Sequence, residues 1–446
     1  MVQTMIDRQR GQDPERGEAH VNGIRLAYAS WRGPRRPRFP PTVVLHGLLQ
    51  SSEGMANLAA HLARGGPVLV PDLRGRGASA QPETGYDPAT MADDVAALIA
   101  ERQLDRPVVI GRVHGGLVAY QLAARHPELV RGIVLGDTSP EVDERRAAQA
   151  RAMVQALPPH FASLDAAQTF YEEGLRVSVA RARHDIPHDL VADTAGGYRW
   201  RHDLAIIERI ETASMPRADW DVVSRIRCPT LLLRGQRGEV SPEVAQRFSQ
   251  LVDHCRVQTI LGARHDVFLG PGAEQALGAI DLFLLRLTGD TTVTNGERAS
   301  AQLLLPGAEA AATPPAEVAG AGIVERLVRA LNGRDDAALA AMFAPDGRIV
   351  QYRPGGKVRE GGLDAARAAF WDLFAELPGA VIAAHDVVAS GDRIACVLTV
   401  RDDAGGAATT DPPPDLAILA PIFLRYRNDT IVELASYGLR LPPDQI

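Results

Sequence analysis

The stretch that most constrains the fold is "VVIGRVHGGLVAY", residues 108–120. An apolar, strand-like run enters Gly-x-x-x-Gly-Gly and continues into a helix-like pattern. This order is typical of a sharp strand–turn–helix elbow, which presents the side chain at its tip for nucleophilic chemistry. The tip residue here is Val113, whose aliphatic side chain forms no covalent bond with a substrate. The sequence therefore predicts an elbow that keeps its glycines without a Ser, Cys or Asp at the tip.

Strand-like and helix-like patterns alternate around this elbow over roughly the first 285 residues. The strand-like runs are apolar along their whole length, as in strands buried on both faces of a parallel sheet. Their alternation with helices predicts an α/β fold with a mostly parallel sheet and helices on both faces. Residues about 140–222 interrupt the alternation with helix-rich, aromatic-containing sequence, which we interpret as an inserted lid. The runs include "TVVLHG" (42–47), "PVLVPDLRGRG" (67–77), "VRGIVLGD" (130–137) and "PTLLLRG" (229–235).

A change of composition divides the chain in two. Residues 289–318 are rich in Ala, Thr, Gly and Pro without a sustained period, and we expect them to form a linker. The first domain is then expected at residues 19–288, after a polar, disordered N-terminus at residues 1–18. The second domain is expected at residues 319–446.

In the second domain, helix-like patterns come first and strand-like runs follow, which predicts an α+β domain with an antiparallel sheet. The segment "GLDAARAAFWDLFAEL" (362–377) has apolar residues at helical spacing, and "AVIAAHDVVAS" (380–390) reads as a strand. The last strand-like run is expected to fold into a hairpin at Asn428-Asp429.

Composition bounds the environment and the partners. The net charge is −7, so nothing in the charge balance favours nucleic acid or an anionic membrane as a partner. No stretch approaches the ~18 apolar residues that a membrane span needs, and the N-terminus has no apolar signal region. We therefore expect a soluble, cytoplasmic protein. Three widely spaced cysteines, with no metal-binding spacing, are expected to be reduced structural thiols: Cys228, Cys255 and Cys396.

Four motifs, in chain order, make residues 19–288 resemble an α/β-hydrolase. "LHGLLQSS" resembles the family's His-Gly oxyanion loop, and "PDLRGRGAS" resembles its Asp-x-Arg-Gly-x-Gly-x-Ser turn. "GRVHGG" stands where the family has Gly-x-Ser-x-Gly-Gly, and "GARHDVF" resembles the loop of the catalytic histidine. The resemblance implies a hydrolase fold whose nucleophile position, Val113, is inert.

The resemblance also implies roles for other residues. His265 falls on the catalytic histidine, and Glu239 falls on the acid position after the seventh strand. Asp137, directly after the sixth strand-like run, is the alternative acid, because cofactor-free dioxygenases of this fold take their acid from that region. Backbone N–H groups of Leu48 and His114 fall on the oxyanion hole, which survives a change of the tip side chain. Candidate substrate-pocket residues are His46, Arg112 and Trp200, although each also fits a structural role.

Residues 319–446 resemble the cone-shaped SnoaL-like/NTF2-like fold in element order and in phrases such as "LNGRDDAALAAMFAPDGRIVQY". That family contains polyketide cyclases, isomerases and dehydratases, and also members that only bind or dimerise. Candidate pocket residues in this domain are Tyr352, His385 and Asp411. The domain is also a candidate unit for homodimerisation.

Two functions of different class follow from these residues. The first is an enzyme in which His265, oriented by Asp137 or Glu239, is a general base toward a small aromatic or polyketide-like substrate. Cofactor-free oxygenation, C–C cleavage or cyclisation, and hydrolysis by an activated water all remain open, and no cofactor or metal is expected. The second is a non-catalytic small-molecule-binding module, with any chemistry in the SnoaL-like domain.

Overall fold

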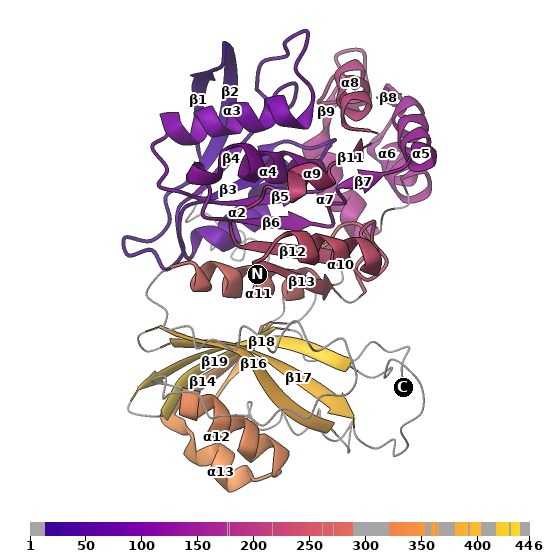
Figure 1. Cartoon of the computed structure of the whole chain (residues 1–446). Coiled ribbons are helices and arrows are strands. Elements are labelled where there is room, and N and C mark those ends of the chain that lie inside the picture. Colours follow the sequence, from indigo (N-terminus) through magenta and orange to yellow (C-terminus); the bar gives the residue numbers. More distant parts are fainter. Residues whose placement is uncertain are drawn as a thin grey trace. The chain divides into compact units, whose positions relative to one another are not determined.

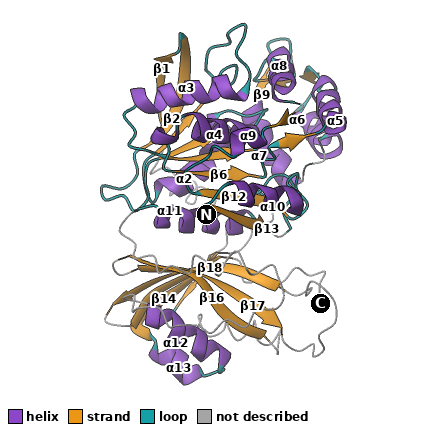
Figure 2. Ribbon diagram, in the orientation of Figure 1, coloured by secondary structure: helices purple, strands orange, loops and turns teal. Residues whose placement is uncertain are grey.

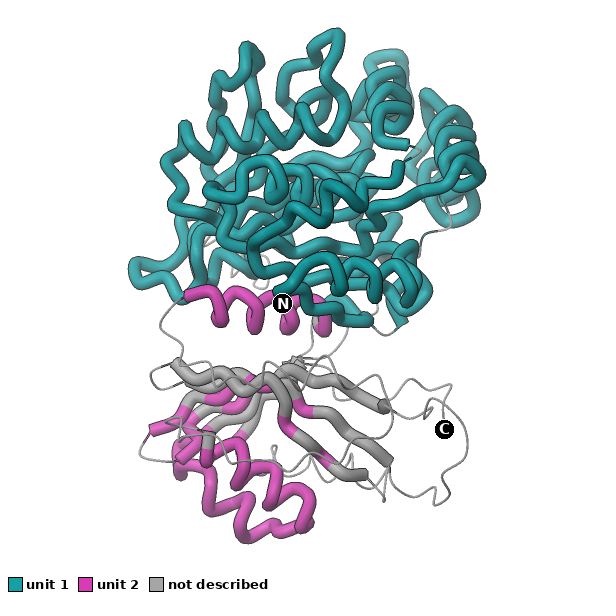
Figure 3. The backbone as a smooth tube through the Cα atoms, in the orientation of Figure 1, with its two compact units in different colours: residues 1–273 teal, residues 274–446 magenta. Residues whose placement is uncertain are grey.

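The computed structural model divides the chain into two compact units, residues 1–273 and 274–446, which are considered separately (Figure 3). Among the residues that it describes, no helix is both long and apolar enough to cross a membrane. The described residues are 14–175, 177, 179–215, 217–260, 262–270, 272–288, 321–352, 358–362, 364, 380–390, 393–402, 416–427 and 430–437.

The first unit is built on an eight-stranded sheet (Figures 1 and 2). The first strand in spatial order pairs antiparallel with the second, and the second pairs antiparallel with the third. Every later pair of neighbouring strands is parallel. The carboxyl ends of β3, β5, β6 and β12 therefore meet at one edge of the sheet. The strands in spatial order are β1 (Glu15–Val21), β2 (Ile24–Trp31), β4 (Val68–Pro71), β3 (Thr42–Leu45), β5 (Val108–Arg112), β6 (Gly132–Gly136), β12 (Thr230–Gly235) and β13 (Cys255–Ile260).

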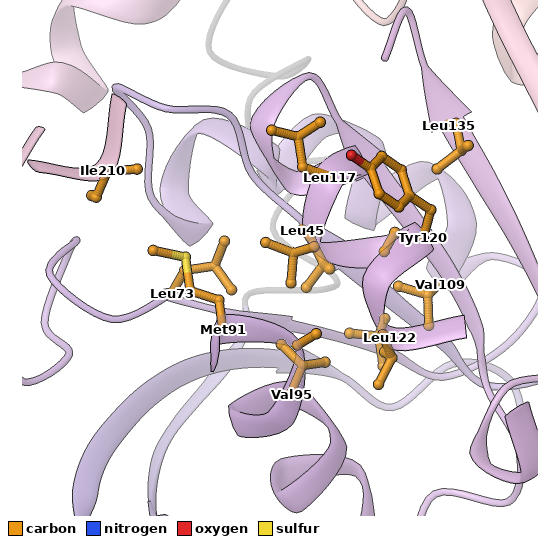
Figure 4. Close-up of a cluster of buried hydrophobic side chains, with 14 of the residues drawn as sticks. Leu45, Leu73, Met91, Val95, Val109, Leu117, Tyr120, Leu122, Leu135 and Ile210 are labelled. Atoms are coloured by element: carbon orange, nitrogen blue, oxygen red, sulfur yellow. The ribbon is translucent and has the colours of Figure 1, made fainter. Parts of the chain in front are cut away.

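Helices follow the strands as the alternation predicts, and α4 starts directly after the elbow tip. A buried cluster of side chains from β3, β5 and β6 and from α3 and α4 packs beneath that elbow (Figure 4). This core fixes where the strand ends lie. The segments are the 3₁₀ helix η2 (Ser52–Met55), α2 (Ala56–Ala63), α3 (Pro88–Glu101), α4 (His114–Arg125), the 3₁₀ helix η3 (Pro127–Leu129) and α10 (Pro242–Leu251).

The predicted lid is an insertion between β6 and β12, and it contains short strands as well as helices. Ile210 of its helix α8 belongs to the same buried cluster as the side chains under the elbow (Figure 4). The elements are β7 (Glu141–Val142), α5 (Glu144–Gln155), β8 (His160–Phe161), α6 (Leu164–Thr169), the π-helical turn η4 (Phe170–Gly174), α7 (Val179–Asp189), β9 (Leu190–Ala192), β10 (Tyr198–Trp200), α8 (Leu204–Ser214), β11 (Arg217–Ala218) and α9 (Trp220–Val223).

Among the described residues of the second unit, three helices precede a six-stranded sheet that is antiparallel except for the β14–β19 pair. The hairpin predicted at Asn428-Asp429 is confirmed, because Arg427 of β18 pairs with Thr430 of β19. The elements are α11 (Ala273–Arg286), α12 (Ala321–Asn332), α13 (Asp336–Ala341) and, in spatial order, β15 (Val358–Gly361), β14 (Phe343–Tyr352), β19 (Thr430–Tyr437), β18 (Leu416–Arg427), β17 (Arg393–Asp402) and β16 (Ala380–Ser390).

Two boundaries differ from the sequence expectation. Residues 15–18, expected in a disordered N-terminus, lie in β1 and pair with β2, because the strand that covers the sheet edge begins earlier than its apolar pattern. Helix α11, expected in the first domain, falls almost entirely in the second unit. Residues 1–13, the linker at 289–318 and most of the helix expected at 362–377 lie outside the described residues.

Candidate active site

The elbow has the backbone geometry that its glycines predict. Val113 has φ 51° and ψ −107°, a conformation that a β-branched residue adopts only under strain. Its N–H donates to the carbonyl of Gly136 at 3.1 Å, and its carbonyl accepts from the Thr138 hydroxyl at 3.1 Å. Strain of this kind costs ~1–3 kcal/mol and persists only where the surroundings fix it. Neighbouring strand β6 and the residues after it provide that fixation.

The glycines of the elbow are required by close packing. A Cβ atom on Gly111 would lie 2.4 Å from the carbonyl oxygen of Gly115, where helix α4 starts. On Gly115 it would lie 2.3 Å from the carbonyl oxygen of Leu45, and on Gly116 it would lie 2.0 Å from Thr138 Oγ1. Side chains larger than hydrogen would therefore push α4 away from β3 and from the segment after β6.

His265 and Asp137 are in direct contact. Asp137 follows β6 immediately, and its Oδ2 lies 2.8 Å from Nδ1 of His265. The carboxyl side chain is completely buried, whereas 43% of the histidine side chain is exposed. When Nδ1 donates to the carboxylate, Nε2 carries the lone pair that can accept a proton.

The backbone of the loop after β12 holds the Asp137 carboxylate. Oδ1 accepts from the N–H groups of Gly235 at 3.0 Å and Val240 at 3.4 Å, and Oδ2 accepts from the N–H of Glu239 at 2.7 Å. A Cβ on Gly238 would lie 2.4 Å from this carboxylate, so the loop can wrap around it only with glycine there. Asp137 itself adopts φ 47°, a region that Asp tolerates better than most residues.

Of the two acids weighed from the sequence, the structure therefore places Asp137, not Glu239, against His265. Glu239 contributes its backbone N–H to Asp137, and as a residue it is exposed to solvent. The expectation that Glu239 orients the histidine differs from this geometry. The physical reason is that the loop turns its amides, not its side chains, toward the buried carboxylate.

The two backbone N–H groups predicted for an oxyanion hole have no hydrogen-bond acceptor among the described residues. His114 is the first residue of α4, where helix N–H groups lack intrahelical partners and the helix dipole is positive. The close approach of Gly115 to the carbonyls of Leu45 and His46 brings this helix end against the loop that contains Leu48.

His46, expected among the pocket residues, is a structural residue of the oxyanion loop. It is completely buried, its Nδ1 lies 2.9 Å from the carbonyl oxygen of Gly47, and its Nε2 accepts from the N–H of Leu73 at 3.0 Å. Burial, together with the charge of Arg76, lowers the pKa of His46 well below its ordinary value. Nδ1 thus contacts the backbone of the loop itself, and Nε2 ties that loop to the turn after β4.

Arg112, also expected in the pocket, is a buried framework residue. Its Nη1 donates to Gln50 Oε1 at 2.5 Å, and its Nη2 donates to Asp266 Oδ2 at 2.9 Å. Asp266 also pairs with Arg181 of lid helix α7. Arg112 thus connects the oxyanion loop to the loop that carries His265, and the lid contacts the same aspartate.

Trp200, expected in the pocket, is buried in an aromatic cluster of the lid. It is 2% exposed, stacks on Tyr171 with ring centroids 5.9 Å apart, and donates from Nε1 to the carbonyl of Pro158 at 2.7 Å. A large apolar ring in a small lid is buried most effectively against the lid's other aromatic residues, which explains the difference from the expectation.

Sequence reasoning missed three buried polar side chains around the elbow. Both ring nitrogens of His114, Nε2 of His202, and Nε and Nη1 of Arg76 are buried without a hydrogen-bond partner among the described residues. Arg76 was visible in the quoted "PDLRGRG" turn, but no periodicity distinguishes it from the exposed arginines of such a turn. His202 comes from the lid, whose placement the sequence does not give.

The second-unit candidates do not lie on neighbouring strands. Tyr352 is on β14 and His385 is on β16, with β19, β18 and β17 between them. The pairing of β16 with β17 also shifts register between His385 and Val388. Asp411 lies outside the described residues.

Comparison with known proteins gives the class of the chain. The α/β-hydrolase fold model matches residues 40–270, which is more than half of the 446 residues, and the chain therefore belongs to this family. A SnoaL-like domain model matches residues 324–434. The chain is thus a fusion of an α/β-hydrolase domain with a SnoaL-like domain.

Individual relatives are hydrolases and esterases by name. The chain is 27% identical over 238 residues to a 2-(acetamidomethylene)succinate hydrolase of Mesorhizobium japonicum, covering 51% of this chain and 82% of that protein. It is 30% identical over 228 residues to an esterase of Mycobacterium tuberculosis, covering 49% of this chain and 73% of that protein.

Two further matches are more limited. A soluble epoxide hydrolase of a Corynebacterium strain is 37% identical, but only over 123 residues, which are 28% of this chain and 41% of that protein. The crystal structure of an E-2-(acetamidomethylene)succinate hydrolase aligns with a TM-score of 0.56 at 23% identity, covering 61% of this chain and 99% of the other. At that identity the structural likeness establishes the fold alone.

Proposed function

We propose that this chain is an enzyme that uses His265 as a general base, oriented by Asp137, without a covalent intermediate at position 113. The observation that carries the proposal is the 2.8 Å contact between His265 Nδ1 and a buried carboxylate that three backbone N–H groups hold in place. Such an arrangement fixes the ring and leaves Nε2 as the proton acceptor.

The proton transfers balance without a nucleophilic side chain. Nε2 of His265 removes a proton either from a water that attacks a carbonyl or from an acidic group of the substrate itself. The negative charge then develops on a substrate oxygen, and the N–H groups of Leu48 and His114 are its proposed donors. The imidazolium is stabilised by Asp137 and returns the proton to the leaving group or the product.

The proposed substrate is a small aromatic or polyketide-like molecule. The hydrolase and esterase names of the relatives support hydrolysis by an activated water. The SnoaL-like domain supports a role in secondary-metabolite tailoring by fold likeness alone. Cofactor-free oxygenation and C–C cleavage or cyclisation require the same general base, so the products formed with and without oxygen separate these reactions.

The decisive variant is His265→Ala, assayed with p-nitrophenyl acetate and with a panel of phenolic and quinonoid compounds, in air and under nitrogen. Turnover is expected to fall at least ~10²-fold while compound binding persists, because general-base catalysis contributes ~10²–10⁴-fold. The exposed His254→Ala is the matched control and should keep full activity. Full activity of His265→Ala would refute the proposal and move the chemistry elsewhere, the SnoaL-like unit included. Binding without turnover by the wild type would identify a non-catalytic module.

A second variant restores the missing side chain. Val113→Ser places a hydroxyl at the tip of an elbow that already has the required backbone angles. The variant is expected to gain p-nitrophenyl ester cleavage with a burst of acyl-enzyme formation. A folded Val113→Ser variant without any gain would show that His265 does not face the tip.

A further inference from the structure

Arg76, in the turn after β4, is a completely buried cation without an ion-pair partner. Its side chain is 0% exposed, and Nη2 donates to the sulfur of Met91 at 3.3 Å. Among the described residues, no carboxylate forms an ion pair with it. Arg74, two residues earlier, shows the ordinary solution, because its Nε and Nη2 donate to the carboxylate of Asp94 at 2.6 and 2.8 Å.

Arg76 nevertheless carries its charge at neutral pH. Burial lowers the pKa of its guanidinium to about 9, which still lies above 7. An unpaired buried charge destabilises the folded state, and an apolar side chain of similar volume would avoid that loss. Arg76 is therefore expected to destabilise the folded state, which points to a role other than packing.

The turn that carries Arg76 contacts both the oxyanion loop and the lid. The N–H of Leu73 donates to His46, and the N–H of Gly77 donates to Nδ1 of lid residue His202 at 3.4 Å. Burial, and after it the charge of Arg76, lowers the pKa of His202 to about 3 and that of His114 well below its ordinary value. The guanidinium thus acts on the first residue of α4 while the imidazoles around it stay neutral.

We propose that Arg76 is the electrostatic partner of an anionic oxygen that binds at the elbow, so that the substrate arrives as an anion or becomes one there. The location of this oxygen, at the N–H groups of Leu48 and His114, rests on the proposed function. Arg76 does not touch the ligand, because it is completely buried. It acts through its field, in the same direction as the positive end of helix α4.

The field of Arg76 is effective because its side chain has no exposure to water and forms no ion pair among the described residues. The nearby carboxylate of Asp72 raises the pKa of Arg76, but its two oxygens accept from the N–H groups of Ser52 and Ala78 instead of pairing with the guanidinium. Electrostatic interactions weaken with the local dielectric constant, which is low around a side chain that has no exposure to water. Arg112 is buried as well, but it already has a carboxylate partner in Asp266. Arg76 is therefore a buried cation without an ion pair among the described residues, whose charge a bound anion would help to balance.

The test compares benzoate with its neutral analogue benzamide by titration calorimetry on the full chain. Wild type is expected to bind benzoate about tenfold more tightly than benzamide. Arg76→Met should lose this preference without losing benzamide binding, whereas Arg76→Lys, which keeps the charge, should retain part of it. The exposed Arg209→Met is the matched control and should behave as wild type. Absence of a benzoate preference in wild type, or its persistence in Arg76→Met, would overturn the proposal.

A stability measurement separates this role from a structural one. Arg76→Met should melt at the wild-type temperature or above it, because a methionine removes the unpaired charge and keeps most of the volume. A large loss of thermal stability in both Arg76→Met and Arg76→Lys would mean that the guanidinium is required for packing, and the proposal would fail.

4-Nitrophenol distinguishes an anion that arrives from one that forms in the site. If the elbow stabilises a newly formed phenolate, the bound compound should show nitrophenolate absorbance at a pH about one unit lower in wild type than in Arg76→Met, a tenfold effect. A benzoate preference without this shift assigns the charge to the incoming substrate. Neither measurement depends on turnover, so His265→Ala should keep the benzoate preference whether or not that variant loses turnover.

Discussion

The two halves of the candidate site differ in whether their buried polar groups have hydrogen-bond partners. At the ends of β6 and β12, the Asp137 carboxylate is fully satisfied by three backbone N–H groups and by His265. At the ends of β3 and β5, the elbow holds a strained Val113, and both ring nitrogens of the next residue, His114, are buried without a partner among the described residues. In the turn after β4, Nε and Nη1 of Arg76 also lack a partner there.

This difference separates geometry from side-chain chemistry. The half that contains His265 and Asp137 has both the backbone geometry and the side chains, since the histidine, the carboxylate and the loop around them are all present. The elbow half keeps the geometry, because glycine packing and hydrogen bonds to Val113 maintain the turn although its side chain is inert. In the proposed function, this half acts on a substrate through its backbone N–H groups and through the charge of Arg76, and variants of the two halves can be compared.

The largest effect is expected in the acid–base half. Asp137→Asn should lower turnover by ~10³–10⁴-fold, because an amide cannot hold the histidine in the required tautomer or stabilise its protonated form. The measurement is kcat of the substrate found with the panel above. Glu239→Gln is the matched control and should stay within about twofold, since this residue contacts Asp137 through its backbone. Equal losses in the two variants would contradict the assignment of the acid.

The buried histidines in and around the elbow should make the free energy of unfolding depend on pH. The folded-state pKa values of His46, His114 and His202 all lie below the ordinary value near 6.5, with burial as the main cause. Below pH 6.5 the unfolded chain binds protons that the folded chain does not, so the free energy of unfolding falls as the pH falls. For each of these histidines, the free energy of unfolding is expected to fall by about 1.4 kcal/mol between neutral pH and pH 5.5.

Urea unfolding at pH 7.5 and 5.5 measures this loss. His202→Gln should reduce the difference in unfolding free energy between the two pH values by the contribution of one histidine. The exposed His254→Gln should leave that difference unchanged. An unfolding free energy that is the same at both pH values would show that these imidazoles are not held neutral.

Much of the fold was predictable because its signals are local. Apolar runs gave the parallel strands, and glycine spacing gave the elbow, whose tip has the positive φ expected of it. The hairpin at Asn428-Asp429 follows from turn chemistry. The start of β1 at Glu15 was missed, because the first half of an exposed edge strand has no apolar pattern.

The site was predictable only in part, because contacts between distant segments leave little trace in sequence. Asp137 and Glu239 both follow strands, and nothing local shows that one loop offers its backbone to the other's carboxylate. Trp200 read as a pocket residue since lid packing is not periodic. Arg74 and Arg76 stand two residues apart, yet one is paired and the other is not.

A smaller effect should come from the glycine packing of the elbow. Gly116→Ala places a methyl group 2.0 Å from Thr138 Oγ1, inside any permitted contact. The free energy of unfolding should fall by about 2 kcal/mol, the usual range for overpacking a tight contact. Gly322→Ala, whose Cβ meets nothing closer than 3.8 Å in helix α12, is the control and should be neutral or slightly stabilising. An unchanged free energy of unfolding in Gly116→Ala would mean that the packing around Gly116 can move apart without cost.

The smallest effect should come from the strained residue itself. Val113→Gly loses a half-buried side chain and gains freedom in the unfolded chain, both unfavourable, but it also releases the ~1–3 kcal/mol that a β-branched residue stores at φ 51°. These contributions nearly cancel, so the free energy of unfolding should change by no more than about 1 kcal/mol. Val109→Gly, in strand β5 before the tip, removes a fully buried side chain at a residue with no positive φ, so it has no strain to release and should cost about 3 kcal/mol or more. Equal losses at the two positions would show that the elbow stores no strain. A collapse of turnover in Val113→Gly would show that the valine side chain, and not only the backbone around it, takes part in the chemistry.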